Sequence, residues 1–376
     1  TMIAQQETTR FRWAQTVLAT RQRKLNRVIN RLPVVELDEQ VTGRPVDFWR
    51  EMVEHASCDD PIWAPIDYSA RVPAVSAQVL QVTGWYDIFL PIQLGDHRAL
   101  VAAGHEPRLV IGPWTHAASP NAGAQTLESL RWLDRHLGPD GPSTDPDLRP
   151  VRIFVTGAEE WRDVECWPPP GHAPQRWHLQ AGGRLDPTAA PASDPDTYTY
   201  DPADPTPSIG GNVMGRSGGR RDQARTERRG DVLVYTSDAL TNAVEVAGDV
   251  AAEVHVGSDC EHFDVFVRLC DVDPKGRSVN VCDGLQRVAP PQSPPAGGTS
   301  AVSVALWPTA HRFEAGHRIR VQVASAAHPR FARNLGTGEP LASGTTTRPA
   351  RITVHHDPDH PSAVTLPVRA EDGASG

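Results

Sequence analysis

Leu109-Val-Ile-Gly-Pro-Trp-Thr-His116 is the stretch of sequence that decides the fold. Its first three residues are apolar and predict a buried strand, and Gly112-Pro113 predicts a sharp turn that presents His116. Upstream, Val79-Leu-Gln-Val-Thr-Gly-Trp-Tyr-Asp87 has the same organisation and ends in a carboxylate. The two patterns predict consecutive strands that each end in a side chain able to take part in proton transfer.

The order and spacing of these two residues favour a catalytic role. His116 lies 29 residues after Asp87, which leaves room for one helix crossing between parallel strands. Asp before His on adjacent strands is the order found in α/β-hydrolases, where the carboxylate accepts the imidazole Nδ1–H. An isolated aspartate after a strand is often a helix N-cap, and a histidine after tryptophan is often structural. We nevertheless predict that Asp87 and His116 are the acid and base of a Ser-His-Asp triad.

The nucleophile of such a triad cannot be located in the chain. It normally occupies a Gly-x-Ser-x-Gly turn between a strand and a helix. The one match is Gly215-Arg-Ser-Gly-Gly219, which places Ser217 after the other two residues instead of before them. No apolar strand precedes this match and no helical pattern follows it. We therefore expect a flexible loop there and no nucleophile in this chain.

The remaining patterns divide the chain into three parts. Residues 11–32 and 48–53 have apolar positions at helical spacing. Residues 74–137 alternate strand and helix, which indicates part of a parallel α/β sheet, although two strands are too few for a complete one. After a Gly/Pro/Asp-rich boundary at 138–150, short β-branched runs beginning with residues 151–156 predict an all-β sandwich or jelly roll.

Composition excludes several classes of protein. The 376 residues carry a formal net charge of -9, which argues against a nucleic-acid or anionic-membrane partner. No apolar run approaches the roughly 20 residues that span a bilayer. We predict no cofactor and a cytoplasmic location. The chain begins with Thr1, which leads us to expect a fragment of a longer protein.

Three residue groups that could bind a metal or nucleic acid have simpler interpretations. The five cysteines form no Cys-x-x-Cys pair and fit reduced thiols better than a zinc site or a disulfide framework. The arginines of residues 216–229 are interrupted by acidic residues and fit a solvated loop. Residues 355–360, His-His-Asp-Pro-Asp-His, lack the usual spacing of metal ligands and are interpreted as a polar turn. No metal site is predicted.

The Asp87 and His116 motifs resemble those of the cocaine-esterase-like (CocE/NonD) hydrolases, relatives of X-Pro dipeptidyl-peptidases and α-amino acid ester hydrolases. Further segments with this resemblance occur in the same order along most of the chain: 47–49, 55–60, 221–223, 231–237, 268–272, 283–284, 313–320 and 329–334.

The resemblance implies a partial α/β-hydrolase core with a helical cap segment, followed by a C-terminal jelly-roll β-sandwich. The expected domains are residues 1–72 for the cap segment, 73–145 for the end of the core and 146–376 for the jelly roll. The serine and the tyrosine of the oxyanion hole would precede this chain. Residues expected to line the acyl pocket are Trp13, Phe48, Trp49, Trp85 and Phe89.

Several functional alternatives remain open at this point. The leading one is a serine hydrolase that cleaves a small-molecule ester, an amide or an X-Pro peptide, present here without its nucleophile. Another is a non-catalytic binding or scaffolding protein that uses the jelly roll. A third is an enzyme whose missing N-terminal half is a separate chain. The partner is then that half or, in a homo-oligomer, another copy of the chain.

Overall fold

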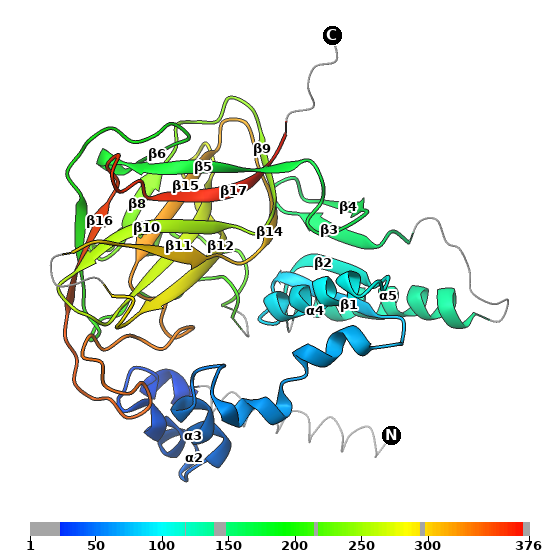
Figure 1. Cartoon of the computed structure of the whole chain (residues 1–376), viewed down its shortest axis with the longest axis horizontal. Helices are drawn as coiled ribbons and strands as arrows, with labels where there is room; N and C mark the ends of the chain where they lie inside the picture. Colours follow the sequence, from blue (N-terminus) through cyan, green and yellow to red (C-terminus); the bar gives the residue numbers. More distant parts are fainter. Residues whose placement is uncertain (1–22, 117, 139–147, 214–216, 294–297, 371–376) are drawn as a thin grey trace.

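The structure is a computed structural model that describes residues 23–116, 118–138, 148–213, 217–293 and 298–370. In Figure 1 a large β domain lies beside a smaller α/β layer, and the N-terminal helices lie below both. The fold class predicted from the sequence is confirmed. No helix among the described residues is long and apolar enough to cross a bilayer.

The described part of the N-terminal segment is helical, as predicted. Asp38 organises it, because its carboxylate accepts hydrogen bonds from the Glu39 and Val46 amides and from Arg50 Nε. Gly43, with φ of 83°, adopts the left-handed conformation and ends the helix Leu37–Thr42. Residues 23–28 are helical, and the elements that follow are η1 (Val34–Glu36), α2 (Leu37–Thr42), α3 (Asp47–Glu54), η2 (Pro61–Ile66) and η3 (Ser69–Ala74).

The smaller sheet is built around two parallel strands. β1 (Leu80–Tyr86) and β2 (Arg108–Thr115) pair from Leu80↔Arg108 to Tyr86↔Thr115, and α4 (Leu90–Ala102) connects them. α5 (Ser119–Leu137) follows β2. The carboxyl ends of both strands therefore lie at one edge of the sheet, which brings the residues that follow them together.

A β-hairpin completes the described part of this sheet. β3 (Val151–Val155) pairs with β2 in parallel, and β4 (Glu160–Val164) pairs with β3 in antiparallel. Residues 151–155, which were expected in the β-sandwich, are therefore a strand of the smaller sheet, whereas Thr156 at their end forms a bridge with His311 of the β domain. The alternating burial of β3 is the pattern of a strand in either sheet, so the local sequence could not identify its partner.

Two glycines allow Trp114 to cross the parallel pair. The indole Nε1 donates to the Thr83 carbonyl at 3.0 Å, and the strand register shifts between Gly84 and Tyr86. A Cβ on Gly84 would lie 2.2 Å from the Trp114 carbonyl oxygen, and one on Gly112 would lie 2.3 Å from the indole ring. The glycines of the Asp87 and His116 motifs thus make room for Trp114, which connects the ends of the two strands.

Gly84→Ala is expected to destabilise the chain by about 1–3 kcal/mol, because the clash involves backbone and cannot be relieved by a side-chain rotation. The matched control is Gly95→Ala in α4, where a Cβ meets nothing within 4 Å and removes backbone freedom from the unfolded chain. Denaturant unfolding should show a loss for the first variant and a neutral or slightly positive change for the second. Equal effects would contradict the assignment of Gly84.

The β domain is formed by a mainly antiparallel set of strands around a large apolar core. Between β7 and β8 a long excursion contains α6 (Ala224–Glu227). The domain begins at β5 and comprises β5 (His172–Gln180), η4 (Ala181–Gly183), β6 (Arg184–Asp186), β7 (Asp196–Tyr200), β8 (Leu233–Thr236), β9 (Val244–Gly248), β10 (Ala251–Ser258), β11 (Phe263–Val272), β12 (Ser278–Val288), β13 (Ser300–Ala305), β14 (Thr309–Phe313), β15 (Arg318–Ala324), β16 (Ala350–His355) and β17 (Ala363–Arg369).

The two sheets share a core. Trp85 at the end of β1 packs on Trp167 with ring centroids 5.3 Å apart, and Ala247 and Ala310 of the β domain belong to the same cluster. Thr156, just after β3, donates its hydroxyl to the Ala310 carbonyl. The β domain is thereby fixed against the edge of the smaller sheet that carries Asp87 and His116.

Candidate functional site

Asp87 and His116 meet at the carboxyl ends of β1 and β2. His116 Nδ1 lies 3.2 Å from Asp87 Oδ2. Asp87 is 1% exposed, whereas the His116 side chain is 41% exposed. A buried carboxylate beside Nδ1 favours the tautomer with its proton on Nδ1, which leaves the Nε2 lone pair to accept a proton. The geometry is that of an oriented general base.

Asp87 uses its two oxygens for different purposes. Oδ1 accepts the Phe89 backbone N–H at 3.0 Å, in a turn that leads into α4, while Oδ2 faces His116. The structural and catalytic interpretations of this aspartate are therefore compatible. From the β domain, Asn212 Nδ2 donates to the Trp85 carbonyl at 2.9 Å and to the Asp87 carbonyl at 3.4 Å, which fixes the turn from outside the sheet.

The backbone and ring of His116 are also held. Asn121, buried in the first turns of α5, donates its amide to the His116 carbonyl at 2.9 Å. Gln125 Nε2 in turn donates to Asn121 Oδ1 at 3.3 Å. The Phe89 ring meets the imidazole edge-on, with centroids 5.0 Å apart and planes at 73°. Phe89 thus forms an apolar wall directly beside the candidate base.

A buried ionic network supports the loop that carries Asn212. Arg268 donates from Nε and Nη2 to Asp283 Oδ2 at 3.0 and 2.9 Å, and from Nη1 to the Ile209 carbonyl and to Gln223. Arg330 pairs with the other oxygen of Asp283. Burial alone would raise the pKa of Asp283, but the two guanidiniums hold it below its ordinary value. The network anchors both sides of the loop next to the site.

This contribution of the β domain was not predicted from the sequence. Asn212 lies in the Pro-, Gly- and Arg-rich excursion, where no periodic pattern marks it. Gly218 of the same loop approaches β2 so closely that a Cβ there would lie 3.0 Å from Thr115 Cγ2. A bridge between Gly211 and Gly219 closes the loop. Ser217 lies inside the loop that this bridge closes, and residues 214–216 lie outside the described part.

The other predicted pocket residues have different locations. Phe89 lies at the site, whereas Trp85 is a core residue that is 2% exposed and donates Nε1 to the Phe154 carbonyl. Phe48 and Trp49 lie on α3, where Phe48 is exposed. Trp13 lies outside the described residues. A pocket role for Phe48, Trp49 and Trp13 stays a prediction.

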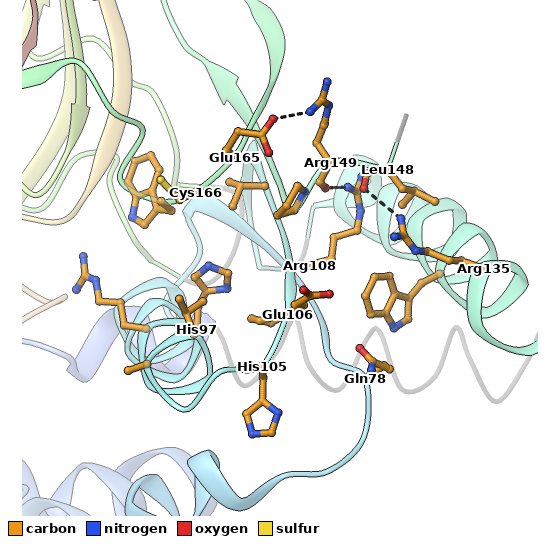
Figure 2. A pocket seen from close by; sticks show the side chains of 18 of the residues that line it. Gln78, His97, His105, Glu106, Arg108, Arg135, Leu148, Arg149, Glu165 and Cys166 are labelled. Carbon is orange, nitrogen blue, oxygen red and sulfur yellow. Dashed lines mark hydrogen bonds and ion pairs between the residues drawn. The ribbon is translucent and has the colours of Figure 1, made fainter. Parts of the chain in front are cut away.

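A cavity of about 520 Å³ lies at the opposite edge of the smaller sheet (Figure 2). Its lining includes Gln78, which precedes β1, and Arg108, which begins β2 and pairs with the buried Glu128 at 2.9 Å. Active sites of parallel sheets lie at the carboxyl ends of the strands. The cavity is therefore separate from the Asp87–His116 site.

Protein-family comparison identifies the chain. The model described as the X-Pro dipeptidyl-peptidase C-terminal non-catalytic domain matches residues 146–365. This chain belongs to the X-Pro dipeptidyl-peptidase and cocaine-esterase family. The model of the X-Pro dipeptidyl-peptidase S15 family itself matches residues 1–118, which include Asp87 and His116. The family resemblance inferred from the Asp87 and His116 motifs is thus confirmed.

One curated relative and two solved structures match over most of the chain. The cocaine esterase of Rhodococcus sp. (strain MB1 Bresler) is 33% identical over 381 residues, covering 92% of this chain and 66% of that protein. An α-amino acid ester hydrolase has a TM-score of 0.79 at 23% identity, covering 92% of this chain and 64% of its own. An aminopeptidase from a marine sediment Thaumarchaeota archaeon has a TM-score of 0.76 at 23% identity, covering 89% and 61%.

These comparisons show the fold, the family and the share of its relatives' length that the chain covers. The two structural matches, at 23% identity, establish the fold. The family is one of serine esterases and peptidases. It spans 61–66% of the length of these relatives.

Proposed function

We propose that Asp87 and His116 are the acid and base of a Ser-His-Asp triad that hydrolyses esters or amides through an acyl-enzyme. The observation that carries the proposal is the 3.2 Å contact between a buried carboxylate and a half-exposed imidazole at the ends of adjacent parallel strands. The serine hydrolases of this family support it.

In the proposed reaction each residue has a defined task. His116 Nε2 takes the proton from a serine hydroxyl supplied from outside this chain, and the serine oxygen attacks the substrate carbonyl. Asp87 stabilises the imidazolium that results. The imidazolium then protonates the leaving alcohol or amine, and water activated by the same nitrogen releases the acid. Phe89 would contact the acyl or leaving group, because it lies against the imidazole.

Two exposed surfaces of the α/β part are suited to contact with a segment that carries the nucleophile. β1 is the terminal strand of the described sheet, so its outer edge can pair with a further strand. α5 also presents four exposed leucines at helical spacing: Leu127, Leu130, Leu133 and Leu137 are 62, 60, 50 and 76% exposed. An apolar stripe of this kind is typical of a surface that another element covers. We propose that the catalytic N-terminal part of the family fold covers it.

The test compares p-nitrophenyl butyrate hydrolysis by this chain with hydrolysis by the same chain joined to the N-terminal segment that its relatives carry. Activity is expected only in the joined form, and it should disappear in His116→Ala. His105→Ala, elsewhere in the same α/β part, and Ser217→Ala are the matched controls and should remain active. Activity of the short chain that survives His116→Ala would overturn the proposal. Inactivity of a folded joined form would favour a binding role instead.

A further inference from the structure

Three histidines from two distant segments of the sequence lie together on the outer face of the β domain. His255 on β10 and His355 on β16 are directly paired across the antiparallel ladder, so their side chains share one face. His360 lies in the turn after β16. Its ring centroid is 5.6 Å from that of His255 and 5.2 Å from that of His355. We call these residues, together with Asp357, the histidine cluster.

Acidic side chains complete the histidine cluster. Both carboxylate oxygens of Asp357 lie 3.2 Å from His360 Nδ1, and one lies 4.0 Å from His355 Nδ1. Glu253, two residues before His255 on β10, places a carboxylate oxygen 3.9 Å from His255 Nε2. One ligand atom each from His355, Asp357 and His360 can be chosen so that all lie within 4.8 Å of one another. This is a compact set of nitrogen and oxygen donors.

The turn that carries the cluster is held in place. Asp357 Oδ1 accepts the Asp359 amide at 2.9 Å and the His360 amide at 3.1 Å. Ser362 Oγ accepts the His255 amide at 2.8 Å and donates to the His355 carbonyl at 2.5 Å. Hydrogen bonds therefore connect the turn to both strands and fix the positions from which the four side chains project.

The imidazoles are suited to ligation. Thr299 Oγ1 lies 3.1 Å from His355 Nε2, while Asp357 lies on the Nδ1 side of the same ring, so this imidazole is oriented as metal-binding histidines are oriented by their outer hydrogen bonds. The side chains of His355, Asp357 and His360 are 22, 21 and 39% exposed, so an ion can reach them and they retain room to move. Imidazole with a single carboxylate suits zinc, nickel or copper better than magnesium or calcium.

We propose that His355, His360 and Asp357, with His255 beside them, bind one divalent transition-metal ion such as Zn²⁺. Ligands at ~2 Å from zinc lie closer together than 4.8 Å, so small rotations of His360 and Asp357 accompany binding. The ion would join β10, β16 and the following turn. The three proposed ligands lie within residues 355–360, which the sequence alone led us to interpret as a polar turn. Pairing of β10 with β16 places His255, 100 residues earlier in the sequence, beside them.

The test uses the full chain without a histidine tag, freed of metal by a chelator. Calorimetric titration with ZnCl₂ or NiCl₂ alone should show one site per chain, and thermal unfolding should move to higher temperature with saturating zinc. MgCl₂ should produce neither effect, because the donor set is rich in imidazole. Failure to observe saturable one-to-one zinc binding overturns the proposal.

Variants locate the binding site. His360→Ala and His355→Ala should each weaken zinc binding by about tenfold or more, and Asp357→Asn by on the order of 10- to 100-fold. His360→Gln provides a second variant that keeps more of the side-chain volume. His262→Ala, a half-buried histidine of the same domain outside the cluster, is the matched control and should bind as the unmodified chain does. Equal zinc affinity of the His360 and His262 variants, with both folded by circular dichroism, overturns the assignment.

Discussion

Asp87→Asn is expected to lower kcat for ester hydrolysis by about 10⁴-fold in the joined form that contains the nucleophile. The variant retains the turn, because Asn Oδ1 can still accept the Phe89 amide. It loses the charge that stabilises the imidazolium of His116, and its amide favours the wrong tautomer of the ring. Asp87→Asn should therefore keep the fold and lose most of the hydrolytic activity.

This substitution distinguishes a catalytic aspartate from one that only stabilises the turn before α4. Steady-state kinetics with p-nitrophenyl butyrate give kcat, and circular dichroism reports the fold. Asp96→Asn, a half-buried aspartate within α4, is the matched control and should leave kcat within a few-fold of the unmodified enzyme. If Asp87→Asn were as active as the control, the contact with His116 would have no catalytic role.

Asp283→Ala is expected to have the largest effect on stability, a loss of about 3–5 kcal/mol in the free energy of unfolding. The variant removes the anion between Arg268, which is 1% exposed, and Arg330, and so leaves buried positive charge without compensation. The same change should release the loop that carries Asn212. Denaturant unfolding near neutral pH measures the loss, and Asp238→Ala, at a largely exposed aspartate, should remain within about 0.5 kcal/mol.

The effect of Asp283 should also depend on pH in one direction. Its pKa in the folded chain is lowered, so its contribution to stability is fully present above the ordinary carboxyl pKa. The contribution is lost as the pH falls through the lowered folded-state pKa. The gap in unfolding free energy between the unmodified chain and Asp283→Ala should therefore narrow in acid. A constant gap from neutral to acid pH would mean that the carboxylate is not stabilised by the two arginines.

Local patterns predicted the elements that carry Asp87 and His116, because a buried apolar run, a glycine and a polar residue are adjacent in the sequence. Features that depend on distant partners were not predictable in this way. Asn212 reaches the site from a loop without periodicity, and β3 pairs with a strand that its own alternation cannot identify. The position of Trp85 beside Asp87 predicts a pocket residue, but the structure buries its ring against Trp167 in the core between the two sheets.

The pairing of the β3–β4 hairpin has a consequence for genetic exchange between members of this family. The match to the C-terminal domain model begins at residue 146, yet residues 151–155 and 160–164 form strands that are hydrogen-bonded within the neighbouring sheet. A gene fusion made at residue 146 would separate β3 and β4 from β2. The edge of β3 that pairs with β2 would then have no partner from its own protein. A crossover between Trp167 and His172 would leave each sheet whole, so recombinants joined there should fold more often than those joined at the sequence-defined boundary.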